Sequence, residues 1–176
     1  MTGPEDRYRS LARAVEAEPL PCAVVDLDAL DINVHRLVGP ARAAGKTLRI
    51  ASKSLRCVPL LEHIQRRAPD VVQGVMCYAA REARVLSERG FDDLLLAYPT
   101  LQPADLELLA QLNRGAGTTR VVVDAREHVD ALAEHARRAG STIPLVIEVD
   151  GSYRPLGGRI HLGARRSPLH DPEAAL

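Results

Sequence analysis

The chain has 176 residues, of which 46% are hydrophobic, so it can form a folded domain with its own core and is not a disordered protein. Lysine plus arginine equals aspartate plus glutamate at 23 each, and only 3% of residues are aromatic, which argues against nucleic-acid binding. The polar start MTGPEDRYRS has no signal core and no apolar run could span a bilayer, so we expect a cytoplasmic protein that does not bind membranes.

The first predicted elements precede any regular repeat. Residues 1–18 form a polar lead-in that is expected to be partly helical. PCAVVD at 21–26 is a short apolar run and predicts a strand. Apolar residues then recur at helical spacing over 27–45, with Asp28 as the expected N-cap and Gly45 as the expected end of the helix.

A strand followed by a helix then repeats along the chain. The predicted strands are 47–53, 71–77, 93–98, 119–124 and 144–150, and the predicted helices are 58–68, 81–90, 103–113 and 126–140. Short apolar strands alternating with amphipathic helices indicate parallel β/α units. Two architectures contain such units, an open doubly wound sheet and a (β/α)8 barrel, and the barrel needs eight strands.

The end of the chain favours the barrel. SPLHDPEAAL has Asp171 as a helix cap and Pro172 at the first helical position, and the sequence stops about one turn later. A natural domain rarely ends as a helix opens, so we expect a truncated chain. The predicted fold is therefore α/β, a partial TIM barrel with about five of its eight β/α units.

Lys53 in TLRIASKSLRC is the first candidate for chemistry. Side chains alternate along a strand, so Arg49, Ala51 and Lys53 should share the face opposite the apolar residues. In a barrel this face points inward, and Lys53 would lie at the carboxyl-terminal mouth, where barrel enzymes place their active sites. A partly desolvated lysine can attack an aldehyde and form a Schiff base. The alternative is a strand-end lysine whose ammonium simply stays in water.

Three segments carry a family resemblance: PCAVVDLDALDINVHRL, LRIASKSLRC and LVIEVDGSYRPLGGR. Together they resemble the N-terminal half of the alanine racemase-like, fold-type III pyridoxal 5′-phosphate enzymes, near the amino acid deaminase/aldolase, D-threonine aldolase and D-serine dehydratase branch. The resemblance covers about residues 19–168. It implies that 19–176 is the cofactor-binding barrel of the alanine racemase N-terminal domain type, without its last three strands and without the C-terminal β domain, to which the 21–26 strand would belong.

The resemblance also implies an activity. Lys53 would hold pyridoxal 5′-phosphate, a substrate amine would displace it to give an external aldimine, and the freed lysine would move a proton at the α-carbon. The full-length protein would be a lyase of the deaminase/aldolase type, and its small-molecule substrate would be an amino acid of D configuration. It would be a homodimer, as relatives often are, and this fragment alone would be inactive.

Two departures separate the chain from alanine racemases proper. Those enzymes have a tyrosine four residues after the lysine, where this chain has Cys57. They also have an arginine where this chain has Pro155, with Arg154 one residue earlier. An alanine or amino acid racemase is therefore an alternative, as are a non-catalytic, single-domain pyridoxal phosphate homeostasis protein and an unrelated flavodoxin-like binding domain.

The other candidate residues lie around the last predicted strand. Arg154 is either a hydrogen-bond partner of the cofactor's phenolic oxygen or a solvated loop arginine. Asp150 either orients Arg154 or caps the next turn. Glu148 and Arg49 both face inward by alternation and are expected to pair, since buried charges need partners. The Arg-Arg-Ser segment at 165–167 resembles an anion-binding loop, although adjacent arginines are usually solvated.

Metal-binding patterns are missing from the sequence. The six histidines form no HExxH motif and no CxxC pair is present, so no metal site is expected in this chain. A divalent metal, as in D-threonine aldolases, would lie in the missing C-terminal part. The three cysteines, Cys22, Cys57 and Cys77, are odd in number and unevenly spaced, which fits a reducing cytoplasm better than a disulfide framework.

Overall fold

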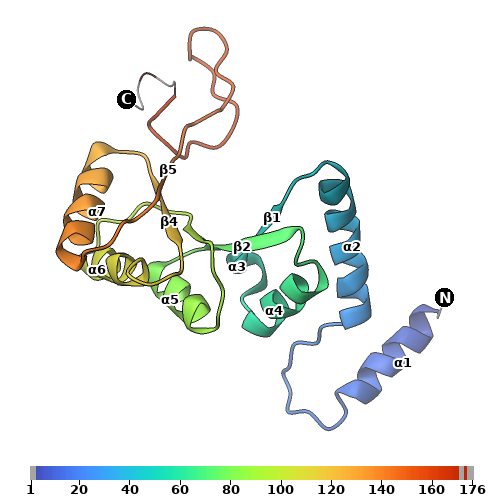
Figure 1. Ribbon diagram of the computed structural model, residues 1–176. Coiled ribbons are helices and arrows are strands. Elements are labelled where there is room, and N and C mark those ends of the chain that lie inside the picture. Colours follow the sequence, from blue (N-terminus) through green and yellow to red (C-terminus); the bar gives the residue numbers. More distant parts are fainter. Residues whose placement is uncertain (1–2, 171–172, 174–176) are drawn as a thin grey trace. The chain divides into compact units, whose positions relative to one another are not determined.

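The structure is a computed structural model that describes residues 3–170 and Glu173 (Figure 1). Chain contacts divide it into two compact units, Met1–Asn33 and Val34–Leu176. The helix predicted to begin at Asp171 falls almost wholly outside the described residues.

The first unit is mostly helical. The lead-in contains α1 (Pro4–Ala14), and α2 (Leu27–Ala43) begins in this unit. The carboxylate of Asp26 accepts a hydrogen bond from the Ala29 backbone N–H at 3.0 Å. Asp26 therefore caps α2, and the prediction of Asp28 as its N-cap was wrong because the helix begins two residues earlier than expected.

The strand predicted at 21–26 is also wrong. This segment is extended, but among the described residues no strand pairs with it. An apolar run becomes a strand only when a neighbouring strand satisfies its backbone groups, and the sequence pattern does not report whether that neighbour is present.

The second unit is built on one sheet of five parallel strands. The strands are β1 (Leu48–Ala51), β2 (Val72–Cys77), β3 (Leu94–Leu96), β4 (Thr119–Val123) and β5 (Leu145–Ile147). The longer connecting helices are α4 (Val58–Arg67), α5 (Ala80–Glu88), α6 (Pro103–Leu112) and α7 (Arg126–Ala139). All five predicted barrel strands and their helices are present, with the strands shorter than predicted.

The strand order distinguishes the two architectures. Neighbours follow the chain as β1-β2-β3-β4-β5, without the reversal that defines a doubly wound sheet. Right-handed crossovers that all step in the same direction place their helices on one face, as in a barrel. The prediction of five β/α units of a TIM barrel is therefore confirmed (Figure 1).

The helix-covered face of the sheet forms the core. Alternate residues of β2, β3 and β4 are at most 2% exposed and pack into two hydrophobic clusters with the helices; they are Val75, Cys77, Leu94, Leu96, Val121 and Val123. Burial raises the pKa of the Cys77 thiol to about 12, which keeps it protonated and unreactive. Ile50 packs against the same core, so its neighbour Arg49 lies on the opposite face, as alternation predicts.

The opposite face, here called the polar face, carries Arg49, Asp93 and Arg120. Arg49 Nη2 lies 2.5 Å from Asp93 Oδ2, and Arg120 pairs with the same carboxylate. Gly74, with φ +68°, is required between them, since a Cβ there would lie 2.2 Å from the Asp93 carbonyl oxygen. The predicted Arg49–Glu148 pair was wrong. Glu148 follows the carboxyl end of β5 and pairs with another residue, whereas Asp93 directly precedes β3 at the level of Arg49.

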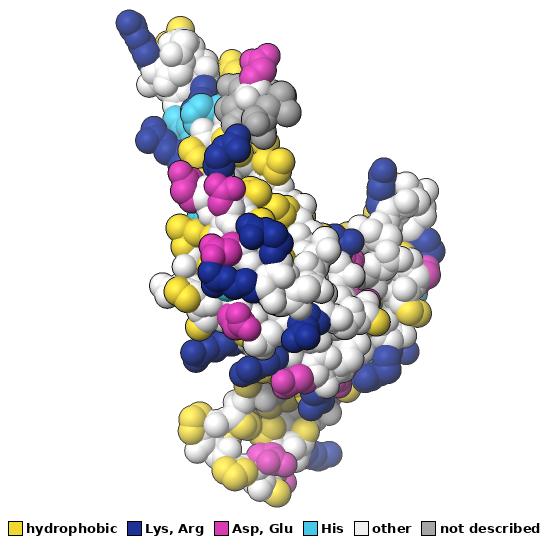
Figure 2. Space-filling model, turned by 60° about the vertical axis from the view of Figure 1, so that its left-hand side comes forward, with side chains coloured by type: hydrophobic (Ala, Val, Ile, Leu, Met, Phe, Trp, Pro, Cys, Tyr) yellow, Lys and Arg dark blue, Asp and Glu magenta, His cyan; other side chains and the backbone are white. Residues whose placement is uncertain are grey.

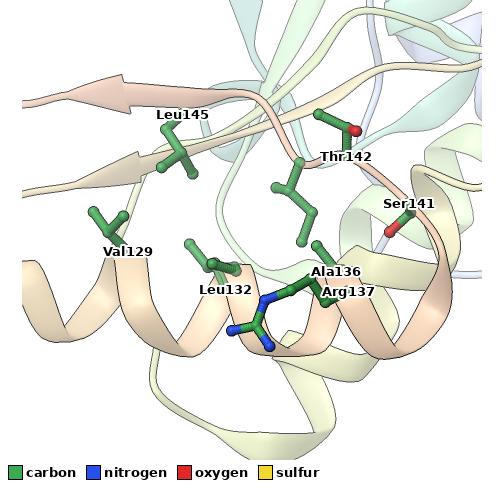
Figure 3. Close-up of a pocket in the computed structure, with 9 residues that line it drawn as sticks. Val129, Leu132, Ala136, Arg137, Ser141, Thr142 and Leu145 are labelled. Carbon is green, nitrogen blue, oxygen red and sulfur yellow. The ribbon is translucent and has the colours of Figure 1, made fainter.

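The sheet has two open edges, at β1 and β5, because no described strand pairs beyond either of them. Beside β5, a largely apolar cavity of about 210 Å³ lies between that strand and α7, lined by Val129, Leu132, Ala136 and Leu145 among others (Figure 3). It lies between the helix layer and the sheet and is a packing feature of this unit.

Within the described residues, no helix is both long and apolar enough for a membrane span.

Candidate active site

The carboxyl ends of the strands bring several polar side chains to one edge of the second unit. Lys53 lies two residues after β1, Tyr78 directly follows β2, Tyr98 lies two residues after β3, and Glu148 directly follows β5. The carboxyl ends of parallel strands meet at the same edge, and in barrels this edge holds the active site.

Lys53 is placed by a single helical turn. β1 ends at Ala51 and α3 (Ser52–Leu55) follows, so the predicted strand to residue 53 was two residues too long. The Ser52 hydroxyl, 1% exposed, donates to the Met76 carbonyl at 2.9 Å and fixes the start of this turn against β2. Lys53 is consequently exposed at the carboxyl end of the sheet.

The amine of Lys53 is held by a tyrosine. Nζ lies 3.1 Å from the Tyr98 hydroxyl and 5.5 Å from the ring centroid, so it lies beside the hydroxyl rather than over the ring face. Tyr78 packs edge-on against the Tyr98 ring at 5.3 Å, and the Arg166 guanidinium lies 5.7 Å from the same ring. The hydrogen bond with Lys53, together with the charges of Lys53 and Arg166, lowers the pKa of the Tyr98 phenol.

A cavity of about 360 Å³ opens beside Lys53. It is lined by Lys53, Arg56, Tyr78, Ala79 and Glu82. Arg56 adopts a left-handed conformation, φ +49°, that closes α3. An amine that can react with an aldehyde and a guanidinium that can pair with a phosphate thus share one cavity. These residues fit the aldehyde and phosphate groups of pyridoxal 5′-phosphate.

Asp150 and Arg154 form a second polar cluster. Arg154 Nη2 lies 2.5 Å from Asp150 Oδ2, and the Ser152 backbone N–H donates to Asp150 Oδ1 at 2.9 Å. Asp150 therefore does both of the things that the sequence left open: it caps the turn and it orients Arg154. Its side chain is 2% exposed, and hydrogen bonds from Ser152 and Arg154 hold the pKa of the carboxyl well below its usual range.

The same cluster lines a cavity of about 340 Å³ that also includes Arg165 and two histidines, His161 and His170. Figure 2 shows basic and histidine side chains gathered on this segment, toward the top of the view. Among the described residues, no hydrogen bond or ion pair joins Lys53 directly to Asp150 or Arg154. Instead, Arg166 lies against Tyr98 and pairs with Glu148 at 2.9 Å.

Sequence reasoning missed three residues near Lys53, namely Arg56, Tyr78 and Tyr98, and it left Arg166 as part of either an anion-binding loop or a solvated pair. The two tyrosines carried a usable signal, because each stands at or just after the end of a predicted strand. Of the adjacent arginines, Arg166 is not simply solvated, and only its contacts in the fold reveal this. In the part of the chain that the structure describes, no group of three or more His, Cys, Asp or Glu side chains could hold a metal ion.

Comparison with known proteins assigns the family. The family model for the alanine racemase N-terminal domain matches residues 25–162. The chain therefore belongs to this family of fold-type III pyridoxal 5′-phosphate enzymes. The crystal structure of D-threonine aldolase from Filomicrobium marinum superposes with a TM-score of 0.74 at 29% identity, over 89% of this chain and 38% of that one.

Two characterised relatives are similar in sequence. The 3-hydroxy-D-aspartate aldolase of Paracoccus denitrificans is 29% identical over 130 residues, which are 74% of this chain and 33% of that protein. The D-threo-3-hydroxyaspartate dehydratase of Delftia sp. is 30% identical over 149 residues, which are 85% of this chain and 37% of that protein. The chain thus spans about a third of the length of these relatives.

Proposed function

We propose that the complete protein is a pyridoxal 5′-phosphate-dependent lyase acting on 3-hydroxy amino acids of D configuration, with Lys53 as the residue that holds the cofactor. The observation that carries the proposal is the exposed amine of Lys53 at the carboxyl end of β1, in a cavity shared with Arg56. When bound, the cofactor supplies an electron sink for the substrate's α-carbon. This chain would supply the first five β/α units of the enzyme.

The residues of the chain have distinct proposed roles. The amine of Lys53, once released from the cofactor, would hold or move a proton at the substrate's α-carbon. Arg154, oriented by the buried carboxylate of Asp150, would donate to the cofactor's phenolic oxygen. Arg56 would pair with the phosphate.

The substrate class comes from the similar enzymes. D-threonine and the two hydroxyaspartates in their names share a 3-hydroxyl and the D configuration. From such a substrate, an aldolase breaks the Cα–Cβ bond and releases an aldehyde, whereas a dehydratase breaks the Cβ–O bond and releases water. We propose a homodimer in the cytoplasm, in which any divalent metal is bound outside the residues described here.

The test is a substrate panel on the complete protein with added pyridoxal 5′-phosphate. We expect consumption of D-threonine or a D-3-hydroxyaspartate, with glycine plus aldehyde or 2-oxo acid plus ammonia as products, and no consumption of the L forms. Chiral chromatography of D-alanine runs in parallel. Interconversion of D- and L-alanine without lyase products would show a racemase instead, and bound cofactor without turnover of any substrate would favour a homeostasis protein.

A further inference from the structure

The hydroxyl of Tyr98 accepts a hydrogen bond from the amine of Lys53. Nζ lies 3.1 Å from that oxygen, within hydrogen-bond range. The two residues are 45 positions apart and come from the ends of different strands, β1 and β3, so the fold and not local sequence brings them together. We propose that Tyr98 is a positioning residue that aims the Lys53 amine, an inference that rests on the proposed function of Lys53.

The surroundings fix the Tyr98 ring from two sides. Tyr78 packs edge-on against it with an interplanar angle of 66°, and the Arg166 guanidinium lies 5.7 Å from its centroid. Arg166 is held in turn by Glu148 at 2.9 Å. A ring confined in this way keeps its hydroxyl at one place, so the flexible lysine stem is oriented by the hydrogen bond at its tip.

Charge favours the ionised phenol. Lys53 and Arg166 contribute positive charge next to the Tyr98 hydroxyl and lower its pKa, and the more distant Glu148 opposes them. At 37% exposure, Tyr98 can release its proton to water.

A neutral amine attacks a carbonyl carbon, and the carbonyl oxygen leaves as water. The hydrogen bond to Tyr98 holds the nitrogen that would make this attack in one direction.

The first experiment needs no cofactor and leaves Tyr98 unchanged. Phenolate absorbance is titrated in the wild type and in Lys53→Met. We expect one tyrosine to ionise at lower pH in the wild type and to return to its ordinary range in Lys53→Met. Identical titration curves for the two proteins would overturn the pair.

Cofactor trapping separates this inference from the proposed function. Borohydride reduction in the presence of pyridoxal 5′-phosphate should tag Lys53 more slowly in Tyr98→Phe than in the wild type at pH 8. Equal rates and equal pH profiles in the two proteins would refute the role of Tyr98 while leaving Lys53 as the cofactor residue. A wild type that is never tagged at Lys53 would refute the proposed function, and the phenolate titration would still test the Lys53–Tyr98 pair by itself. Tyr8→Phe, which changes an exposed tyrosine of α1, is the matched control and should be tagged at the wild-type rate.

Discussion

The two faces of the five-stranded sheet are stabilised by different interactions. The helix-covered face carries six buried side chains of β2, β3 and β4, each at most 2% exposed: Val75, Cys77, Leu94, Leu96, Val121 and Val123. The polar face carries Arg49, Asp93 and Arg120, and its carboxyl edge carries Lys53 and Tyr98. Burial of apolar surface stabilises the helix-covered face. The polar face instead depends on the ion pairs of Asp93 and on Gly74. Substitutions on the first face should therefore cost stability, and substitutions at the carboxyl edge should cost chemistry.

The largest effect should come from Lys53→Ala at the carboxyl edge. Removing the proposed cofactor amine should lower kcat of the complete protein by about a thousandfold or more while the thermal unfolding midpoint hardly moves, because the side chain is exposed. Steady-state kinetics and calorimetry check the two parts. Lys46→Arg is the control and should retain full activity; a Lys53→Ala variant with more than a tenth of wild-type kcat would contradict the assignment.

In α6, which packs on the helix-covered face, Leu109→Ala should give the largest loss of stability. Leu109 lies in the core cluster with 0% exposure, and truncation there leaves a cavity, at a cost of about 3 kcal/mol in the free energy of unfolding. Urea unfolding measures it. Leu101→Ala, at 51% exposure, should change the same quantity by less than about 0.5 kcal/mol. Equal losses for the two leucines would mean that this face is not the core.

Gly74→Ala tests whether the polar face depends on its glycine. A methyl group at φ +68° is strained and would meet the Asp93 carbonyl and the Arg49 guanidinium, so we expect a loss of about 2 kcal/mol. Gly39→Ala in α2 is the matched control, since nothing lies within 4 Å of the added Cβ; it should be neutral or stabilising by about 0.5 kcal/mol. Both are read from urea midpoints, and a Gly74→Ala protein as stable as Gly39→Ala would refute the close approach.

The smallest expected effect is on the stability of the fold at low pH. The pKa of Asp150 is lower in the folded chain than in the unfolded one, because Ser152 and Arg154 hydrogen-bond its carboxylate. Its contribution to stability is thus present above the unfolded pKa of about 4 and is lost as pH falls below it. Asp150→Asn should flatten the fall in stability between about pH 4 and pH 2, measured by thermal unfolding at each pH. If the stability of Asp150→Asn falls between pH 4 and pH 2 as steeply as that of the wild type, the fold does not stabilise the charged form of Asp150.

The helix-covered face was predictable from sequence because it depends only on periodicity. Apolar runs and helical spacing located all five barrel strands and the four long helices after them. The errors lie where contacts with residues distant in the sequence decide the structure. The apolar run at 21–26 has no neighbouring strand among the residues that the structure describes, and β1 ends early where the Ser52 hydroxyl bonds to the Met76 carbonyl.

The candidate site was predictable only in part for the same reason. Lys53 stood out because an ammonium near the end of an apolar run is conspicuous, and the Asp150–Arg154 pair is local in sequence. Tyr98 and Arg166 are far from Lys53 along the chain. The strand-end position of Tyr98 indicated the same edge of the sheet, but no local pattern indicated the contact of Tyr98 with either residue. Arg49 paired with Asp93 rather than Glu148, because alternation gives the face of a residue but not its level along the strand.

The most direct test of the account asks which lysine meets the cofactor. The complete protein is incubated with pyridoxal 5′-phosphate, reduced with borohydride and digested, and the tagged peptide is identified by mass spectrometry. We predict the tag on Lys53, with its loss in Lys53→Ala and its retention in Lys46→Arg. A tag on Lys46 with Lys53 untouched, or no tag in this chain at all, would contradict the central claim.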